Sequence, residues 1–339
     1  MAALSDALRV SSGQALVTGA QLTATLIATA RVKPVCGTSA VAGRVVWAPG
    51  KSIWYASMLA GGVAGVVLYW SWGAAIASLV LGILTLCLGH SVGMHRLLIH
   101  RSFETPRWLE YVLVYLGTLV GMAGPIGMFR IHEIRDWQQN QGDCHSFAKH
   151  DVGFWKDAFW QMHCEQVLSR PPELHIESGV VNDRFYRWLE ATWRLQQLPL
   201  ALALYAAGGP GFVLLGVCLR VAVSLTGHWC VVHVAHTRGD RPYVLQNIVV
   251  DGRNVRGLGL LTFGECWHNN HHAFPRSARM GHRAGQIDPG WLVIWALMQA
   301  GLAWNVLVPD HRAARPGLLR TEEARRQRRG DVHRQVRRR

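Results

Sequence analysis

The pattern of apolar and polar positions divides the chain into two long apolar blocks separated by a more polar section. The first block, residues 53–89, contains no formal charge, and the second, residues 195–236, contains only Arg220. A helical crossing of a bilayer needs about 20 apolar residues, so each block is long enough for two crossings. Turn residues interrupt the blocks at residues 70–73 and 208–211. The pattern therefore predicts an all-α protein with four membrane-spanning helices in two hairpins.

A third apolar stretch, residues 109–128, is long enough to cross but contains four glycines and a proline. If it crossed, the histidines before it and those after it would lie on opposite sides of the membrane. We therefore expect a re-entrant or interfacial segment that breaks at Gly124–Pro125, which is possible where protein covers the backbone. All histidine-bearing segments then lie on one face, in a helical cap.

Lysine and arginine set the expected orientation of the spans. The two hairpin turns contain neither residue, whereas the segment before the first span, the section after residue 128 and the C-terminus contain most of them. The positive-inside rule then places the termini and the histidines in the cytoplasm. The seven cysteines form no C-x-x-C pair, which is consistent with a reducing compartment.

The charge distribution also suggests the domain boundaries. Half of the net charge of +14 lies in the last thirty residues, where 11 arginines stand against four acidic residues. Such a tail is typical of a disordered segment attracted to anionic lipid headgroups, and it does not indicate nucleic-acid binding. We expect a poorly defined extension over residues 1–50, one membrane domain over residues 51–308, and this basic tail over residues 309–339.

The most informative motif is Gly-Glu-Cys-Trp-His-Asn-Asn-His-His-Ala-Phe-Pro, at residues 264–275. His268, His271 and His272 stand at relative positions 0, 3 and 4, so on an α-helix they fall within an arc of roughly 100°. Imidazole is a suitable ligand for iron, zinc, copper and nickel. The motif therefore predicts a metal site, and a group of surface histidines at a helix end is the less favoured interpretation.

Further histidine groups lie at the ends of apolar segments. His95 and His100 are five residues apart, so on an α-helix their rings would point about 140° apart. They converge only if the helix ends or bends between them. His132 and Asp136 are four residues apart and share one helix face. The last group closes the predicted fourth span and consists of His228, His233 and His236.

The order of these motifs resembles the membrane fatty acid desaturase family, typified by acyl-CoA delta-9 desaturases. The likeness covers residues 50–305 and is most specific in residues 267–275. In that family the histidine boxes bind a non-haem di-iron centre. The resemblance implies iron ligation by the matching histidines, which are His95, His100, His132, His236, His268, His271 and His272.

The second box departs from the family pattern, which has H-x-x-H-H. Arg135 and Asp136 occupy the positions of the paired histidines. Three explanations compete: Asp136 replaces an imidazole as an oxygen ligand, which iron accepts; another histidine folds back; or one iron is lost. We favour ligation by Asp136, because H-x-x-x-D presents both donors on one helix face. Loss of one iron is the least favoured explanation, because a bacterial branch of the family resembles this chain in having H-x-x-R-D-W. The histidines that could fold back are His145, His150 and His163.

Other polar residues near the boxes are expected to support the site. Glu265 lies three residues before His268, and we interpret it as a residue that orients a ligand rather than one that bridges the irons. Asn269 either supports a ligand or caps the helix. Arg135 stays charged, so it either pairs with Asp136 or contacts an anionic headgroup of the substrate. Additional ligands or supporting residues could come from His145, His228 and His233.

The resemblance implies a membrane acyl desaturase that inserts a cis double bond, using O₂ and two electrons from a separate ferredoxin, rubredoxin or cytochrome. The acyl chain could be carried by CoA, by acyl carrier protein or by a lipid. The likeness to bacterial members implies the inner (cytoplasmic) membrane. A di-iron hydroxylase is the alternative among enzymes. A membrane metal transporter or sensor is less favoured, because such a protein needs polar residues near the bilayer centre and the spans contain almost none.

Overall fold

The computed structural model describes residues 31–246, 248, 252–309 and 317–323, which form a mostly helical protein. Its elements in chain order are β1 (Val32–Lys33), β2 (Gly43–Trp47), α3 (Pro49–Leu68), α4 (Trp72–Ile83), η1 (Leu84–Ile99), α5 (Arg107–Thr118), α6 (Pro125–Gln139), α7 (Ser146–Lys149), α8 (Phe154–His163), β3 (Cys164–Leu168), β4 (Glu173–Leu174), α9 (Ser178–Val181), α10 (Arg184–Thr192), α11 (Gln197–Gly208), α12 (Pro210–Val213), η2 (Leu214–Leu219), α13 (Arg220–Thr237), β5 (Tyr243–Leu245), α14 (His268–Ala273), α15 (Pro289–Gln299) and β6 (Leu318–Arg320).

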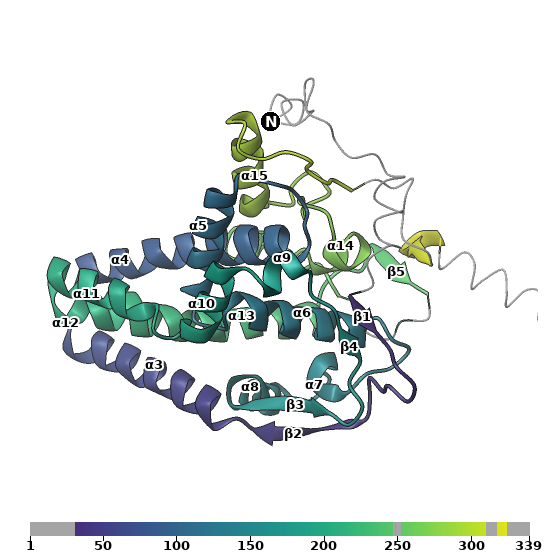
Figure 1. Ribbon diagram of the computed structural model, residues 1–339, viewed down its shortest axis with the longest axis horizontal. Helices are drawn as coiled ribbons and strands as arrows, with labels where there is room; N and C mark the ends of the chain where they lie inside the picture. Colours follow the sequence, from purple (N-terminus) through teal and green to yellow (C-terminus); the bar gives the residue numbers. More distant parts are fainter. Residues whose placement is uncertain (1–30, 247, 249–251, 310–316, 324–339) are drawn as a thin grey trace, which may run out of the picture.

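Three of the described helices are long and apolar enough to cross a membrane. They are α3, the continuous helix Trp72–Ile99 formed by α4 and η1, and the continuous helix Pro210–Thr237 formed by α12, η2 and α13. The predicted fourth span corresponds to α11, an apolar helix of 12 residues, which is short for the bilayer core. In Figure 1 the α3–α4 and α11–α12 turns lie at the same end of the molecule. The two hairpins are present, and a full crossing by α11 stays a prediction.

Polar contacts fix the start of α11 against neighbouring segments. Gln197, its first residue, is buried and donates a hydrogen bond of 2.9 Å to the carbonyl of Leu119. Its side-chain oxygen accepts a hydrogen bond of 2.8 Å from Arg220, the one charged residue of the second apolar block. Because a buried guanidinium must be paired, the start of α11 is fixed to the side of α13 at this level.

The break predicted within residues 109–128 is confirmed. α5 ends at Thr118, and α6 begins at Pro125 with Gly124 before it. The carboxylate of Glu190 accepts hydrogen bonds of 3.0 and 2.9 Å from the N–H groups of Ile126 and Gly127. These N–H groups lie in the first turn of α6 and lack intrahelical partners, and the helix dipole favours a negative charge there.

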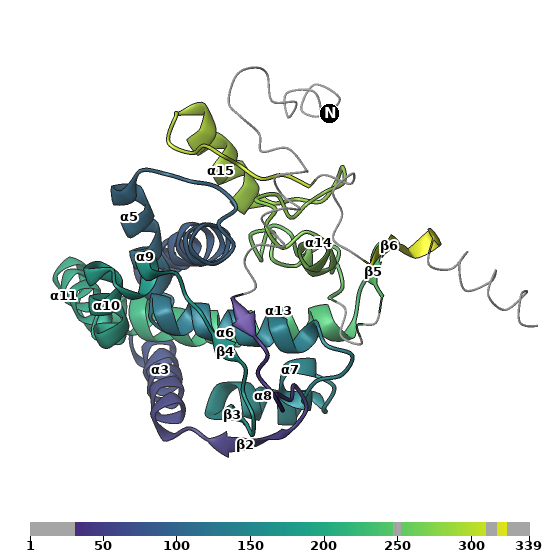
Figure 2. The ribbon, with the colours of Figure 1, turned by 45° about the vertical axis from the view of Figure 1, so that its right-hand side comes forward.

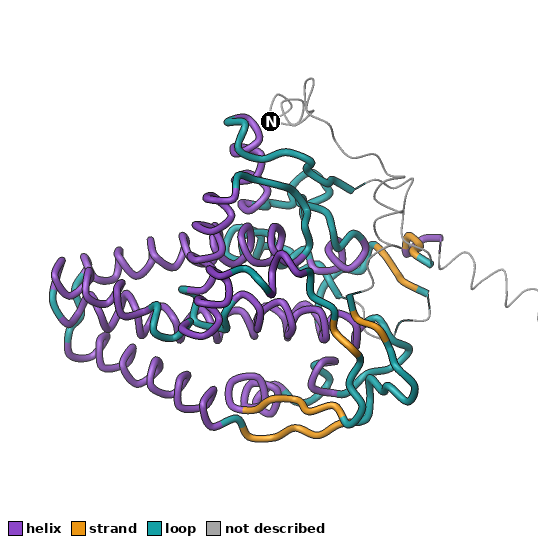
Figure 3. The backbone as a smooth tube through the Cα atoms, viewed as in Figure 1, coloured by secondary structure: helices purple, strands orange, loops and turns teal. Residues whose placement is uncertain are grey.

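The prediction of an all-α protein is incomplete, because three antiparallel two-stranded sheets are present. β1 pairs with β4, β2 with β3, and β5 with β6. Figure 3 shows the strands away from the hairpin turns, towards the opposite end. Each strand has at most five residues and its partner lies far along the chain. Neither alternation nor a hairpin turn therefore marks it in the sequence.

The predicted domain boundaries at residues 50 and 308 stay predictions. Strands β1 and β2 lie within residues 1–50 and pair with β4 and β3. Much of the predicted disordered tail lies outside the described residues, as do residues 1–30.

The C-terminal part of η1 forms the centre of the core. One side packs with α5 and α15 in a cluster that includes Val92, Leu97 and Ile294. The other side packs with α6 and α10 in a cluster that includes Met94 and Phe129. Almost every residue from position 89 to position 100 is buried, so this stretch is a rigid base for whatever it carries.

Glycines allow η1 and α5 to approach closely. A Cβ atom on Gly89 would overlap backbone atoms of Leu116 and Gly117. A Cβ atom on Gly82, which lies in α4, would meet nothing within 4 Å. The two positions therefore form a matched pair for testing this packing.

We expect Gly89→Ala to lower the free energy of unfolding by about 1–3 kcal/mol, because backbone atoms of α5 cannot yield as a flexible side chain can. Gly82→Ala should leave stability unchanged or raise it by about 0.5–1 kcal/mol, the usual gain from replacing a helical glycine. Thermal unfolding of the detergent-solubilised protein measures both. Equal effects of the two substitutions would contradict the close packing of η1 on α5.

Candidate metal centre

A widened helical turn brings the first pair of histidines together. Over η1 the backbone hydrogen bonds run from residue i to residue i+5, and the N–H of His100 donates to the carbonyl of His95 at 3.0 Å. Residues five apart therefore lie above one another instead of about 140° apart, as they would on an α-helix. The ring centroids of His95 and His100 are 4.8 Å apart. The expected bend is thus a π-helical turn, a type of helix that is frequent at functional sites.

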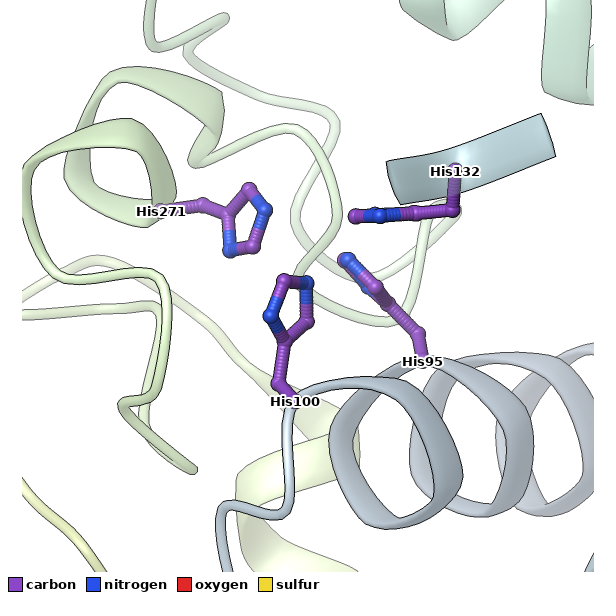
Figure 4. A group of neighbouring side chains, drawn as sticks. All are labelled: His95, His100, His132 and His271. Atoms are coloured by element: carbon purple, nitrogen blue, oxygen red, sulfur yellow. The ribbon is translucent and has the colours of Figure 1, made fainter. Parts of the chain in front are cut away.

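These two histidines meet His132 of α6 and His271 of α14 in one group. Each offers a ring nitrogen, and the four nitrogens lie within 4.8 Å of one another. The centroid of His95 is 4.9 Å from that of His132 and 4.7 Å from that of His271. Figure 4 shows the four rings turned towards a common centre. Four imidazoles in this arrangement could hold one metal ion.

The second group lies next to the first. His236, at the end of α13, meets His268 and His272 of α14, again with one nitrogen each within 4.8 Å. The Nε2 atoms of His268 and His272 face each other at 3.1 Å. His271 belongs to the first group, and its ring centroid is only 5.9 Å from that of His268. The short helix α14, above α13 in Figure 2, therefore contributes to both groups, and two candidate metal positions are adjacent.

The nitrogens that face these centres fit a bound metal. Seven ring nitrogens in the two groups are buried without a hydrogen-bond partner: Nδ1 and Nε2 of His95 and of His132, Nε2 of His100 and His236, and Nδ1 of His271. Leaving a buried polar atom unpaired costs about 1–3 kcal/mol each. Native proteins seldom tolerate several such atoms together unless an ion or water binds there. The donor set therefore suits the metal centre of the family that the sequence resembles.

Burial also keeps the imidazoles in the form that binds metal. Loss of solvent holds the pKa of His100, His132, His268 and His271 well below the ordinary value, and neighbouring histidines and the guanidinium of Arg135 depress it further. A metal needs a neutral imidazole. These four rings are therefore ready to bind a metal at neutral pH without first losing a proton.

Glu265 lies where the sequence predicted a supporting carboxylate, although it supports a residue of the first box. Its Oε2 atom lies 2.7 Å from Nδ1 of His95. Its Oε1 atom accepts a hydrogen bond of 2.5 Å from Ser91. A carboxylate on one ring nitrogen fixes the tautomer and directs the other nitrogen at the metal. This geometry agrees with an orienting role for Glu265.

A buried ion pair fixes the segment between α14 and α15 to η1. The guanidinium of Arg96, which has no solvent exposure, pairs with Asp288 at 2.9 Å and donates to the carbonyls of Ala278 and Phe263. Asp288 also accepts a hydrogen bond of 2.8 Å from the backbone N–H of Met280. Removing one partner would leave a buried charge uncompensated, which typically costs roughly 3–5 kcal/mol. Arg96 therefore fixes the segment that follows α14 against η1.

Asn269 fixes α14 in place. Its amide donates to the carbonyls of Tyr243 and Gly252 at 3.1 and 2.7 Å, and its oxygen accepts from the N–H of Tyr243 at 2.9 Å. Asn254 in turn accepts from the N–H groups of Asn269 and Asn270. A helix of six residues is not stable alone, so these side chains supply the stability that its length does not.

The altered second box lies beside the first group. Oδ2 of Asp136 is 3.4 Å from Nδ1 of His132, within ion-pair distance but without a hydrogen bond at this nitrogen. Asp136 is not among the residues whose ligand atoms converge in either group. The Nη2 atom of Arg135 lies 3.7 Å from Oδ1 of Asp136. The structure thus brings Arg135 and Asp136 together, and the headgroup contact stays a prediction for Arg135.

The other predicted histidines lie outside both groups. His145 caps α7, with its Nδ1 accepting from the N–H of Phe147 at 3.1 Å. His163 bonds to Ser52 at 2.7 Å. His228 packs against His90 with ring centroids 4.9 Å apart.

A third cluster centres on Asp157 of α8, a residue that the sequence analysis missed. The buried carboxylate accepts hydrogen bonds from His150, His233 and Trp229 at 3.0, 2.7 and 2.8 Å. Burial alone would raise the pKa of Asp157, but these donors outweigh it and lower the pKa to about 2. A signal was available: Trp229 and His233 share a face of α13, and Asp157 is the only acidic residue of α8, a helix that contains two phenylalanines and two tryptophans.

Comparison with known proteins agrees with the geometry. The fatty acid desaturase family model matches residues 69–329. The sn-1 stearoyl-lipid 9-desaturase of Anabaena variabilis is 35% identical over 250 residues, covering 71% of this chain and 87% of the relative. The icosanoyl-CoA 5-desaturase of Limnanthes douglasii is 34% identical over 253 residues, covering 71% and 67%.

A third relative, the chloroplastic palmitoyl-monogalactosyldiacylglycerol delta-7 desaturase of Arabidopsis thaliana, is 33% identical over 248 residues, covering 71% of this chain and 64% of the relative. The names of these relatives agree on the reaction and differ in the acyl carrier and in the position of the double bond. The chain therefore belongs to the fatty acid desaturase family and is a membrane oxidoreductase of that family.

Proposed function

We propose that this protein introduces a double bond into a fatty acyl chain carried by a membrane lipid, with two iron ions bound at the two histidine groups. The observation that carries the proposal is the pair of adjacent buried groups, whose unpartnered ring nitrogens converge on two neighbouring positions. By their names, similar cyanobacterial proteins act on stearoyl or palmitoyl lipids at position 9. Their similarity supports a lipid-linked substrate in place of acyl-CoA or acyl carrier protein.

The chain's own residues bind the metals and set their geometry. The chemistry that a bound di-iron centre supplies in this family is the O₂-dependent removal of two hydrogens from an acyl chain, with two electrons from an external donor. The ligands proposed for the first position are His95, His100, His132 and His271, and those for the second position include His236, His268 and His272. Glu265 and Asp136 act as carboxylates that fix the tautomers of His95 and His132.

We place the metal centre on the cytoplasmic side of the membrane. The hairpin turns contain no lysine or arginine, and the histidine groups lie at the opposite ends of the spanning helices. A separate ferredoxin, rubredoxin or cytochrome would then deliver electrons from the same side. The proposal for the lipid carrier and that for the orientation are independent of each other.

Expression in a host with a defined fatty acid pool tests the activity. We expect a new lipid species lighter by two hydrogens, with one double-bond position, measured by lipid mass spectrometry with double-bond localisation. His271→Ala should abolish the product because it removes a proposed ligand of the first position, whereas His175→Ala, at an exposed histidine outside the site, should not. A product heavier by one oxygen would indicate a hydroxylase, and an activity confined to acyl-CoA would contradict the lipid carrier.

An iron-content measurement can distinguish an orienting role of Asp136 from direct ligation of iron by its carboxylate. Asn at this position can still accept a hydrogen bond from His132, but it is a poor substitute for an anionic ligand. We expect Asp136→Asn to keep both irons and to weaken retention against a chelator by roughly 10–100-fold, as for other residues that orient a ligand. His132→Ala should instead lose iron outright. If Asp136→Asn lost one iron, measured as iron per chain, the result would show that Asp136 is itself a ligand.

Cysteine labelling tests the orientation. Single cysteines introduced at Trp72 and Gly209 in a cysteine-free background should react with an impermeant reagent added outside intact cells. Cysteines at Ser146 and Arg320 should react only after the cells are opened, because both positions lie on the proposed cytoplasmic side. If Ser146 and Ser102 proved to lie on opposite sides, α5 and α6 would have to cross the membrane, and the arrangement of the two groups would be wrong.

A further inference from the structure

The two metal positions are unequal in the number of histidines that the structure brings to them. The first has four convergent imidazoles and the second has three. The missing imidazole corresponds to the altered second box, since Asp136 lies beside His132 of the first group. For the second position to have as many imidazole ligands as the first, a fourth imidazole must come from another segment.

His150 is built in the same way as the proposed ligands. Its Nδ1 atom is held by the carboxylate of Asp157 at 3.0 Å, and the side chain is buried. His95 and His132 also have carboxylates near their Nδ1 atoms, those of Glu265 at 2.7 Å and Asp136 at 3.4 Å, although neither contact is a hydrogen bond. A metal-binding histidine typically has its other ring nitrogen fixed in this manner. Asp157 thus leaves Nε2 as the nitrogen of His150 that is available to a metal.

His150 also lies beside the second group, next to His236. Its ring centroid is 5.3 Å from that of His236, with the planes at 31°, although its ligand atoms are grouped with those of Asp157 and His233 and not with those of His268 and His272. Within the first group the corresponding centroid distances range from 4.7 to 6.2 Å. The spacing between His150 and His236 therefore falls within the range of histidines that could share one ion.

The backbone at His150 supports a functional constraint. This residue ends α7 in the left-handed conformation, with φ of 57° and ψ of 29°. Residues other than glycine seldom adopt this conformation, and the strain persists only where the surroundings enforce it. The hydrogen bonds of Asp157 connect His150 to His233 and Trp229 of α13, the helix that carries His236.

The cluster around Asp157 is better explained as a hydrogen-bond network that orients His150 than as a separate metal site. The Oδ2 atom of Asp157 accepts hydrogen bonds from three donors, on His150, His233 and Trp229. A nitrogen that donates a hydrogen bond has no lone pair for a metal, and the indole of Trp229 can only donate. The nitrogens that face Asp157 are therefore used for hydrogen bonding.

We propose that His150 is a ligand of the second metal position, oriented by Asp157, and that it supplies the imidazole which the altered second box lacks. The inference rests on the proposed di-iron function, because it assigns one more ligand to the same centre. It also gives a role to the short α7 segment, which carries His145 before it and His150 after it.

Iron content provides a test that does not depend on turnover. Purified wild-type protein should contain about two irons per chain, and His150→Ala should lose about one of them. His145→Ala is the matched control, because it removes a histidine at the other end of α7 that lies outside both groups. The control should keep both irons. Asp157→Asn should keep iron but release it to a chelator roughly 10–100-fold more readily.

Rescue with imidazole separates ligation from a structural role. His150→Gly leaves space for a free imidazole, and added imidazole should restore the second iron. Two irons in His150→Ala, or a loss that imidazole fails to restore in His150→Gly while His145→Ala keeps both irons, would overturn the inference. Wild-type protein without iron would instead contradict the proposed function itself, so the two failures are distinguishable.

Discussion

The need to keep neutral imidazoles buried, with their nitrogens directed inward, is the constraint on which the rest of this structure depends. Unpartnered buried nitrogens are costly, so the segments that carry them must be held by other interactions until a metal compensates. The Arg96–Asp288 ion pair fixes the segment between α14 and α15 to η1. The side chain of Asn269 fixes α14. Much of the polar hydrogen bonding near the centre therefore serves to position histidines.

The membrane helices serve the same purpose from the other side. Close packing of η1 against α5, through Gly89 and Gly117, gives the first histidine pair a rigid base. The π-helical hydrogen bonding of η1 then aligns residues five apart, which an α-helix cannot do. An apolar helix that faces lipid along most of its length thus ends in a segment with a different geometry and a different function.

The altered second box shows how the loss of histidines from a ligand motif can be compensated by a residue elsewhere in the chain. In this chain Asp136 takes the place next to His132 that an orienting carboxylate occupies elsewhere in the site. The Asp157 network brings His150 towards the second position, so an imidazole from outside the box becomes available there. Arg135 places a positive charge near the same histidines, which favours their neutral form.

The sequence by itself determined the features that depend on local pattern. Two uncharged or nearly uncharged blocks indicated the hairpins, Gly124–Pro125 indicated the break between α5 and α6, and the spacing of His268, His271 and His272 indicated a metal site. These features follow from hydropathy, from backbone chemistry and from the period of a helix, all of which are readable over short distances.

Only the tertiary structure decided how those histidines are shared between two positions. The spacing suggested one common face, but α14 directs His271 to one group and His268 and His272 to the other, because the partners come from three distant segments. The short strands were likewise unpredictable, because they depend on pairing between residues far apart in the chain, and such pairing leaves no periodic signal in the sequence.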